Sequence, residues 1–168
     1  NDIPTFIWLE KIKNKYEYYN YSMKGEFIED QYGYPGSKPP WGKITALNLN
    51  NGKIIWQIPF GEYEELTKKN FPITGTFNYG GVTATAGEII FATGTLDNKI
   101  RGYDMNTGEE LWSFKMPYSG SSPPTIYEYK DEQYVLVPAT GSTTMKNTYP
   151  KISVYGNKVY AFKIKKID

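Results

Sequence analysis

The chain contains no cysteine and no histidine among its 168 residues. Without cysteine there can be no disulfide, no thiol nucleophile and no thiolate metal ligand. Without histidine the commonest general base and the usual zinc or copper ligand are missing, together with every catalytic triad built on imidazole. Serine and cysteine hydrolases of the triad type are therefore excluded.

The sequence also lacks an excess of charge of either sign and any long apolar run. Nineteen Lys and Arg residues stand against eighteen Asp and Glu, and the formal net charge is +1. The basic residues are scattered among acidic ones, so no basic face for nucleic acid is expected. No segment approaches the roughly 18 consecutive apolar residues of a membrane span, so we expect none in this chain.

Aromatic and turn-forming residues are abundant instead. Aromatic residues make up 17% of the chain, which also contains sixteen Gly and eleven Pro. Aromatic side chains favour strands, and such frequent Gly and Pro interrupt long helices. One short helix is predicted around residues 62–69, ending before Pro72.

A phrase of fourteen residues occurs twice, 56 positions apart. Residues 43–56 read KITALNLNNGKIIW and residues 99–112 read KIRGYDMNTGEELW. Five positions are identical, and a shorter echo, NKVYAF, occupies residues 157–162. Self-similarity at such a spacing indicates one supersecondary unit that is repeated.

The repeated unit has the pattern of a hairpin that ends in tryptophan. The turns around Gly52 and Gly108 suit tight connections, and a Trp follows each Gly at the same distance. Further strand pairs are expected ahead of the second phrase and of the echo, at residues 82–86 with 88–93 and 125–129 with 133–138. Four strands in roughly 50 residues are typical of a β-propeller blade.

The predicted fold class is therefore all-β, an arc of about three propeller blades of four-stranded antiparallel sheets. Residues 1–40 are assigned to part of a preceding blade plus a connector, and residues 41–168 to the blades. A propeller needs about four to eight blades to close its ring. We therefore expect the remainder of the propeller as a partner, from the same parent chain or from a second polypeptide.

Structural roles are predicted for the most prominent acidic and tryptophan residues. Asn48 and Asp104 precede turns, where such side chains cap the backbone. The acidic residues at 62, 64 and 65 suit the start of the short helix, and no metal site is predicted in this chain. Trp56 and Trp112 are expected to dock one blade on the next, and Trp41 to pack in the core.

Several segments, taken in order, resemble the pyrroloquinoline-quinone (PQQ) dependent dehydrogenases. They are PPWGKITALNLNNGKIIW at residues 39–56, TGTFNYGG at 74–81, LDNKIRGYD at 96–104 and EYKDEQYV at 128–135. The sequence is most similar to the C-terminal part of the glucose dehydrogenase-like branch of these quinoproteins.

The resemblance implies a propeller of about eight blades with PQQ and Ca²⁺ on its axis. It implies oxidation of an aldose or alcohol hydroxyl by hydride transfer to PQQ, with an Asp as general base and the cation polarising the quinone. The base and the Ca²⁺ ligands belong to blades outside this chain, so no catalytic or metal-binding residue is assigned here. A periplasmic or extracytoplasmic location follows from the family alone.

Four loops of a propeller of this kind are expected to converge on the channel mouth: residues 76–81, 93–98, 119–124 and 140–144. By resemblance, Asn78, Tyr79 and Gly80 are the candidate PQQ-binding residues, and Thr76 and Ser142 are substrate-proximal candidates. The alternative for Asn78 is to satisfy the backbone of its turn, and for Tyr79 to pack between blades. Ser142 stands where membrane-bound glucose dehydrogenases have a His, which weakens the expectation of glucose as substrate.

Two other classes of protein remain open from the sequence. A non-catalytic propeller can use the same repeat as a scaffold for protein–protein interaction, and a free-standing β domain can bind carbohydrate on exposed Tyr. Neither alternative requires PQQ, so quinone absorbance and dye reduction with alcohols discriminate between them and the enzyme.

Overall fold

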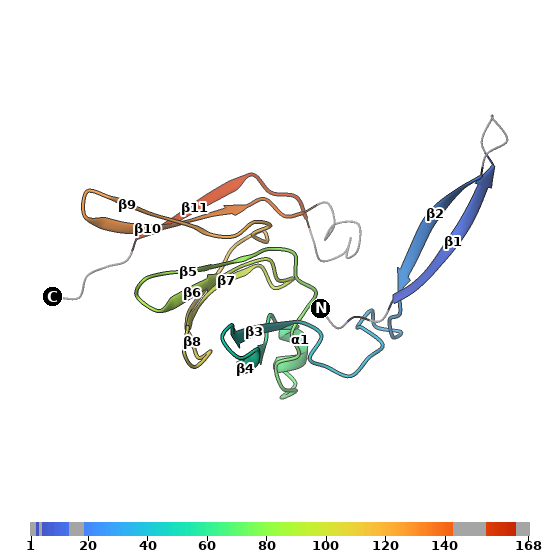
Figure 1. The fold of residues 1–168 in the computed structure, drawn as a ribbon, viewed down its shortest axis with the longest axis horizontal. Helices are drawn as coiled ribbons and strands as arrows, with labels where there is room; N and C mark the ends of the chain where they lie inside the picture. Colours follow the sequence, from blue (N-terminus) through green and yellow to red (C-terminus); the bar gives the residue numbers. More distant parts are fainter. Residues whose placement is uncertain (1–2, 4, 14–18, 143–153, 164–168) are drawn as a thin grey trace.

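The computed structural model describes residues 3, 5–13, 19–142 and 154–163, and it is built almost entirely of antiparallel strands (Figure 1). The elements are β1 Thr5–Lys13, β2 Tyr19–Phe27, β3 Lys43–Asn48, β4 Lys53–Pro59, α1 Glu64–Thr67, β5 Val82–Ala84, β6 Ile89–Ala92, β7 Lys99–Asp104, β8 Glu110–Lys115, β9 Thr125–Tyr129, β10 Glu132–Ala139 and β11 Lys158–Lys163. The all-β prediction is confirmed. The predicted helix is present, in a shorter form.

Three sheets follow one another along the chain from residue 43 onward. They are the pair β3–β4, the four-stranded sheet β5–β6–β7–β8 and the three-stranded sheet β9–β10–β11. Figure 1 shows them side by side, with β5–β8 between the other two. The four-stranded meander is the blade that the sequence predicts, and the arc of successive sheets is that of a propeller.

Strands β1 and β2 pair with each other over nine residues and with no other strand of the described chain. In Figure 1 this hairpin projects away from the three sheets. Large apolar side chains on it are exposed, among them Phe6, Leu9 and Met23. The assignment of residues 1–40 to a preceding blade stays a prediction.

The two tryptophan hairpins share an irregularity that the residue pattern does not reveal. In β7–β8, Gly102 pairs with Trp112 and Tyr103 pairs with Glu110, so that Leu111 is an extra residue. In β3–β4, Ala46 pairs with Trp56 and Leu47 pairs with Ile54, so that Ile55 is the extra residue. Each hairpin therefore has a β-bulge directly before its tryptophan, and a bulge re-aims the side chains that follow it.

The turns of these hairpins are held by the side chains predicted for them. The Asn48 Oδ1 accepts a hydrogen bond from the Asn50 amide at 2.9 Å. The Asp104 Oδ1 accepts from the amides of Asn106 and Thr107, at 2.9 and 2.8 Å. These bonds lower the pKa of Asp104, the Thr107 amide contributing most. The predicted capping role of both residues is confirmed.

Trp56 joins its hairpin to the next sheet. Its indole Nε1–H donates to the Met105 carbonyl at 2.9 Å, in the turn between β7 and β8. Its ring lies against Gly108 of the same turn, where a methyl group built on Gly108 would stand 2.8 Å from the ring. The predicted docking role of Trp56 is confirmed.

Apolar clusters fill the spaces between successive sheets. Phe60, Ala92 and Tyr103 are buried between β3–β4 and β5–β8. A larger cluster lies between β5–β8 and β9–β11, and comprises Phe91, Ile100, Met116, Val135, Val137 and Ala139. Trp41 is buried in a third cluster, stacked on Tyr34 and edge-on to Tyr63, as the prediction of a packing role requires.

Candidate functional site

The loops predicted to converge are hydrogen-bonded to one another in series. The Tyr79 amide donates to the Gly94 carbonyl at 2.8 Å, which joins the loop before β5 to the loop after β6. The Ser119 hydroxyl donates to the Thr95 carbonyl at 3.0 Å, and the Gly141 amide donates to the Ser119 carbonyl at 2.9 Å. One continuous surface of loops therefore runs from the middle sheet to the last one.

Gly80 lies where two of these loops cross with their backbones in contact. A Cβ built on Gly80 would collide with the Thr93 carbonyl, and one built on Gly94 would collide with the Gly80 amide. Gly94 has a φ of +102°, a conformation that L side chains rarely adopt. The crossing therefore requires glycine in both loops. The backbone contact alone explains why residue 80 is a glycine, without any ligand.

Asn78 and Tyr79 directly precede Gly80 in the loop that crosses the Gly94 loop. Asn78 forms an isolated bridge with Thr95, and its Nδ2 donates to the Thr76 carbonyl at 3.4 Å. The Tyr79 side chain is 52% exposed and belongs to none of the buried clusters. Tyr79 is therefore not packed between the sheets that the structure describes, and its role toward a ligand or a further blade stays a prediction.

Asn78 and Gly80 line a pocket of about 130 Å³ between the first two sheets. Its other lining residues are Lys43, Ile44, Phe60, Gly81, Val82 and Thr93. Sites for small molecules are usually about 300–1,000 Å³. The pocket of this arc is thus large enough for the edge of a cofactor and too small to enclose one.

The two substrate-proximal candidates are both buried. The Thr76 hydroxyl donates to the Phe77 carbonyl at 2.9 Å and accepts from the Leu96 amide at 3.2 Å, so it supports the neighbouring loop. Ser142 is 8% exposed and follows Gly141 at the end of the loop series. Their predicted role beside a substrate stays a prediction. The segment 143–153, which includes Thr144, lies outside the described residues.

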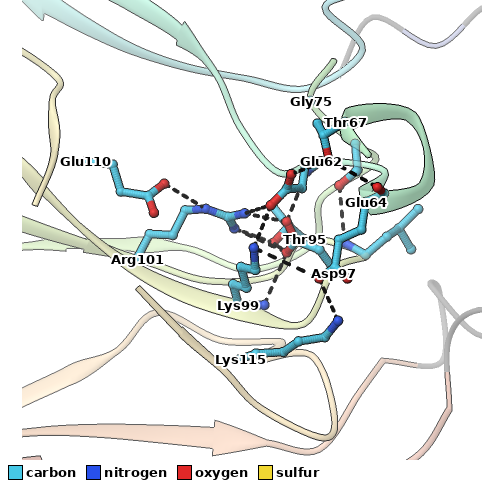
Figure 2. A network of polar contacts seen from close by, with 12 residues as sticks. Glu62, Glu64, Thr67, Gly75, Thr95, Asp97, Lys99, Arg101, Glu110 and Lys115 are labelled. Atoms are coloured by element: carbon cyan, nitrogen blue, oxygen red, sulfur yellow. Dashed lines mark hydrogen bonds and ion pairs between the residues drawn. The ribbon is translucent and has the colours of Figure 1, made fainter. Parts of the chain in front are cut away.

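A network of charged residues beside this loop surface was missed in the sequence (Figure 2). Asp97 and Arg101 form a buried ion pair, with side chains 1% and 4% exposed. Asp97 also accepts from the Thr95 hydroxyl at 2.5 Å and from the Glu62 amide at 3.0 Å. Since Glu62 follows β4, the pair joins the first sheet to the second.

The outer members of the network surround this pair with further ion pairs. Lys99 Nζ lies 2.5 Å from Glu62 Oε1, and Arg101 Nε lies 3.1 Å from Glu110 Oε2. Lys115 Nζ lies 2.6 Å from an oxygen of Glu64, in the short helix. Glu62 and Glu64 therefore interact with cations from β7 and β8.

The ion pair determines the ionisation of Asp97. Burial alone would raise the pKa of its carboxyl group, but the hydrogen bond and the charge of Arg101, the Thr95 hydroxyl and the Lys99 amide together lower it. Burial likewise acts to lower the pKa of Arg101, and Asp97 overcomes that effect and raises it. Both groups are charged at neutral pH, and each depends on the other.

One signal in the sequence could have identified this pair. With an offset of 56 residues, Asp97 aligns with Trp41 and Arg101 with Thr45. Arg101 replaces Thr45 within the repeat, and Asp97 stands two residues before it, where the first copy has Trp41, whereas the turn Asn50/Asn106 and Gly52/Gly108 and the Trp are kept. A charged residue at a position where the other copy has an uncharged one indicates a role specific to that copy. Here the role is to connect two sheets.

Across the described residues no three or more Asp and Glu side chains are grouped so that they could hold a metal ion. In that same part of the chain, no helix has the length and apolarity that a membrane crossing requires.

The fold and the loop surface define the class of this protein as a β-propeller whose successive sheets are tied by tryptophan docking. Residues 8–135 match the PQQ family described as the glucose/ethanol/alcohol dehydrogenase β-propeller domain. The chain belongs to this family of PQQ-dependent dehydrogenases.

Individual relatives agree with this assignment. The chain is 35% identical over 115 residues to the quinoprotein glucose dehydrogenase of Escherichia coli (strain K12), a match that covers 66% of this chain and 14% of the relative. It is 38% identical over 119 residues to the glycerol dehydrogenase large subunit of Gluconobacter oxydans (strain 621H), covering 67% of this chain and 16% of the relative. The chain thus spans a small fraction of the length of these relatives.

A solved structure shows the same fold. A europium-containing methanol dehydrogenase superposes with a TM-score of 0.67 at 19% identity, over 98% of this chain and 30% of that protein. At this identity the likeness supports the propeller fold alone.

Proposed function

We propose that this chain is the C-terminal portion of a PQQ-dependent dehydrogenase that oxidises an aldose or alcohol hydroxyl group. The observation that carries the proposal is the crossing of the loops at Gly80 and Gly94, which presents Asn78 to a pocket and leaves Tyr79 exposed beside it. The names of the relatives, which include a glucose and a glycerol dehydrogenase, favour a polyhydroxylated substrate.

In this proposal the residues of the crossing border one side of the cofactor. PQQ, when bound, supplies the acceptor of the hydride. The amide of Asn78 can donate or accept a hydrogen bond at the edge of a quinone or carboxylate. The exposed ring of Tyr79 can pack against the cofactor or the substrate, and contacts between aromatic groups contribute about 0.5–1.5 kcal/mol.

The proposal places the general base and the Ca²⁺ ligands in blades outside these 168 residues. The buried Asp97 carboxylate is already paired with Arg101, and the acidic residues near the helix are paired with Lys99 and Lys115. Ca²⁺ takes about six to eight oxygen ligands. The paired carboxylates of this chain are poorly suited to supply them.

The test uses the polypeptide that carries this sequence in its native source, purified and supplied with PQQ and Ca²⁺. Dye reduction with aldoses and alcohols, dependent on PQQ, is the expected result. A polypeptide that binds no PQQ and reduces no dye would contradict the proposal and favour the scaffold alternative.

Substitution of a single tyrosine then tests the site itself. We expect Tyr79→Ala to weaken PQQ binding roughly tenfold, through loss of the ring contact. Tyr129→Ala is the matched control, because Tyr129 is similarly exposed, at 57%, and lies at the far end of β9. Equal binding by both variants would remove Tyr79 from the site.

A further inference from the structure

Thr95 belongs both to the crossing of the loops and to the charged network. It directly follows Gly94, whose carbonyl accepts a hydrogen bond from the Tyr79 amide at 2.8 Å, and it forms an antiparallel bridge with Asn78. The Thr95 residue is completely buried, with an exposed fraction of 0%. Thr95 is therefore shielded from solvent, and its backbone adjoins the loop that carries the candidate cofactor-binding residues.

The charged network provides the Thr95 hydroxyl with both a donor and an acceptor (Figure 2). Arg101 Nη1 donates to Thr95 Oγ1 at 3.2 Å, and this hydroxyl donates to Asp97 Oδ1 at 2.5 Å. The same Arg101 nitrogen also donates to Asp97 Oδ1 at 3.2 Å, which closes a set of three hydrogen bonds. Because the hydroxyl both donates and accepts, and because Thr is β-branched, these bonds fix the rotamer of Thr95.

The rest of Thr95 is fixed by other segments of the chain. Its carbonyl accepts hydrogen bonds from the Ser119 hydroxyl at 3.0 Å and from the Asn98 amide at 3.2 Å. A Cβ built on Gly61 would stand 2.8 Å from Thr95 Cγ2, so the two loops are closely packed at this methyl group. A shift of Thr95 would therefore disturb contacts of its hydroxyl, its carbonyl and its methyl group together.

Stability alone is a poor explanation for a buried ion pair at this place. Replacing such a pair by apolar side chains of similar volume is often neutral or stabilising. What Arg101 supplies is direction, because its planar guanidinium presents several N–H groups in a fixed fork. This fork donates to Glu110 on β8 as well as to Asp97 and Thr95. It therefore ties the loop after β6 to the strands β7 and β8 of the middle sheet.

We propose that Thr95 is a positioning residue of the cofactor site, held in place by Asp97 and Arg101. It fixes the backbone from which Asn78 and Tyr79 project. The inference rests on the proposed function, because it concerns the orientation of these two side chains toward PQQ. Thr95 itself touches neither cofactor nor substrate. Side chains bind a ligand more tightly when their supporting residues hold them in place beforehand.

The experiment measures PQQ affinity by equilibrium dialysis, with Ca²⁺ present, on the polypeptide that carries this sequence in its native source. Thr95→Val removes the hydroxyl at similar volume and should weaken PQQ binding about tenfold. Thr95→Ser keeps the hydroxyl and should bind within about twofold of the natural protein. Thr85→Val is the matched control, because the Thr85 hydroxyl donates to the Ile89 carbonyl at 3.1 Å in the turn at the opposite end of β5 and β6.

Two further measurements separate positioning from a general loss of stability. Urea unfolding of the PQQ-free variants gives their stabilities, and a purely structural role would make affinity follow stability in Thr95→Val and Thr85→Val alike. A positioning role lowers the affinity of Thr95→Val and leaves that of Thr85→Val unchanged. In a double-mutant cycle with Tyr79→Ala, Thr95→Val should weaken binding by less than about a further threefold, because it acts partly through Tyr79.

The outcomes distinguish this inference from the proposed function. A natural polypeptide that binds no PQQ would overturn both. PQQ binding by the natural polypeptide, with equal affinities for Thr95→Val and Thr85→Val or with additive losses in the cycle, would overturn the inference alone. Where Thr95→Val does not fold, Arg101→Lys replaces it, since it keeps the buried charge but removes the fork. Arg101→Lys should weaken PQQ binding at least about threefold, and unchanged binding would overturn the inference.

Discussion

Asp97 has two neighbours that matter for stability, the Arg101 guanidinium and the Glu62 amide, and these come from different sheets. We expect Asp97→Asn to lower the free energy of unfolding by about 3 kcal/mol at pH 7, because it leaves the buried Arg101 charge without compensation. Urea unfolding measures the change. Asp131→Asn, in an exposed turn, is the control and should alter stability by less than about 0.5 kcal/mol.

The Asp97–Arg101 pair also predicts that the stability of the chain depends on pH. The pKa of Asp97 is lowered below its ordinary value of 3.8 in the folded chain, so the ionised form favours folding. This contribution is complete above the unfolded pKa and is lost as the pH falls below it. The unfolding free energy of the natural chain should fall more steeply than that of Asp97→Asn between about pH 5 and pH 2. Parallel curves would show that Asp97 is not responsible.

Gly108 combines a left-handed backbone with a close neighbour. Its φ is +76°, and a methyl group there would meet the Trp56 ring. Gly52, at the equivalent turn, has a φ of +69° and no atom within 4 Å of such a methyl group. Gly52→Ala should cost about 1 kcal/mol from backbone strain, and Gly108→Ala about 2–3 kcal/mol from strain plus the displaced ring. Equal losses in thermal or urea unfolding would mean that the ring moves freely.

At the scale of elements, neighbouring sheets are joined where the tryptophan of one hairpin contacts the turn of the next sheet. Trp56→Phe keeps most of the ring but loses the hydrogen bond to the Met105 carbonyl, and should lower stability by about 1–2 kcal/mol. Trp112→Phe is the comparison, because no hydrogen bond of the Trp112 indole occurs within the described residues. A smaller loss is expected for Trp112→Phe, and the reverse order would contradict the docking role of the indole N–H.

The elements were predictable from the sequence to the extent that they repeat. The turns at Asn48 and Asp104 and the strands on either side follow from local residue chemistry, which is why they agree with the structure. The bulges at Ile55 and Leu111 do not, because an extra residue in an apolar run leaves the hydrophobic pattern unchanged. The Asp97–Glu62 contact joins residues 35 positions apart, and only the packed sheets bring them together.

Some features of the candidate site were likewise predictable from the sequence, and others were not. The convergence of its loops follows from the propeller topology, and the hydrogen bonds from Tyr79 through Ser119 to Gly141 agree with it. The burial of the Thr76 hydroxyl could not be foreseen, since it depends on the Leu96 amide of another loop. The roles of Asn78, Tyr79, Gly80, Thr76 and Ser142 toward ligands remain predictions.

At the scale of the whole molecule, we expect protection of backbone amides against hydrogen exchange to differ between the strands. β7 is an inner strand of its sheet and its residues 100–103 are buried, whereas within the described part of the chain β1 and β2 pair only with each other and carry exposed apolar side chains. Native-state hydrogen exchange should therefore be at least about a hundredfold slower in β7 than in β1. Equal protection of the two would indicate that the hairpin is covered by contacts not described in this structure.

The bulge before each tryptophan makes chain length more critical than residue identity at this point. A bulge bends its strand and increases the local twist, so it sets the direction from which the next side chain meets its neighbour. Replacing Leu111 by another apolar residue keeps the bulge, whereas deleting it would leave Trp112 opposite Gly102 in a regular ladder without that bend. Sequences descended from this repeat can vary widely in composition, but a deletion between the turn glycine and the tryptophan would change the angle at which the indole meets the next sheet.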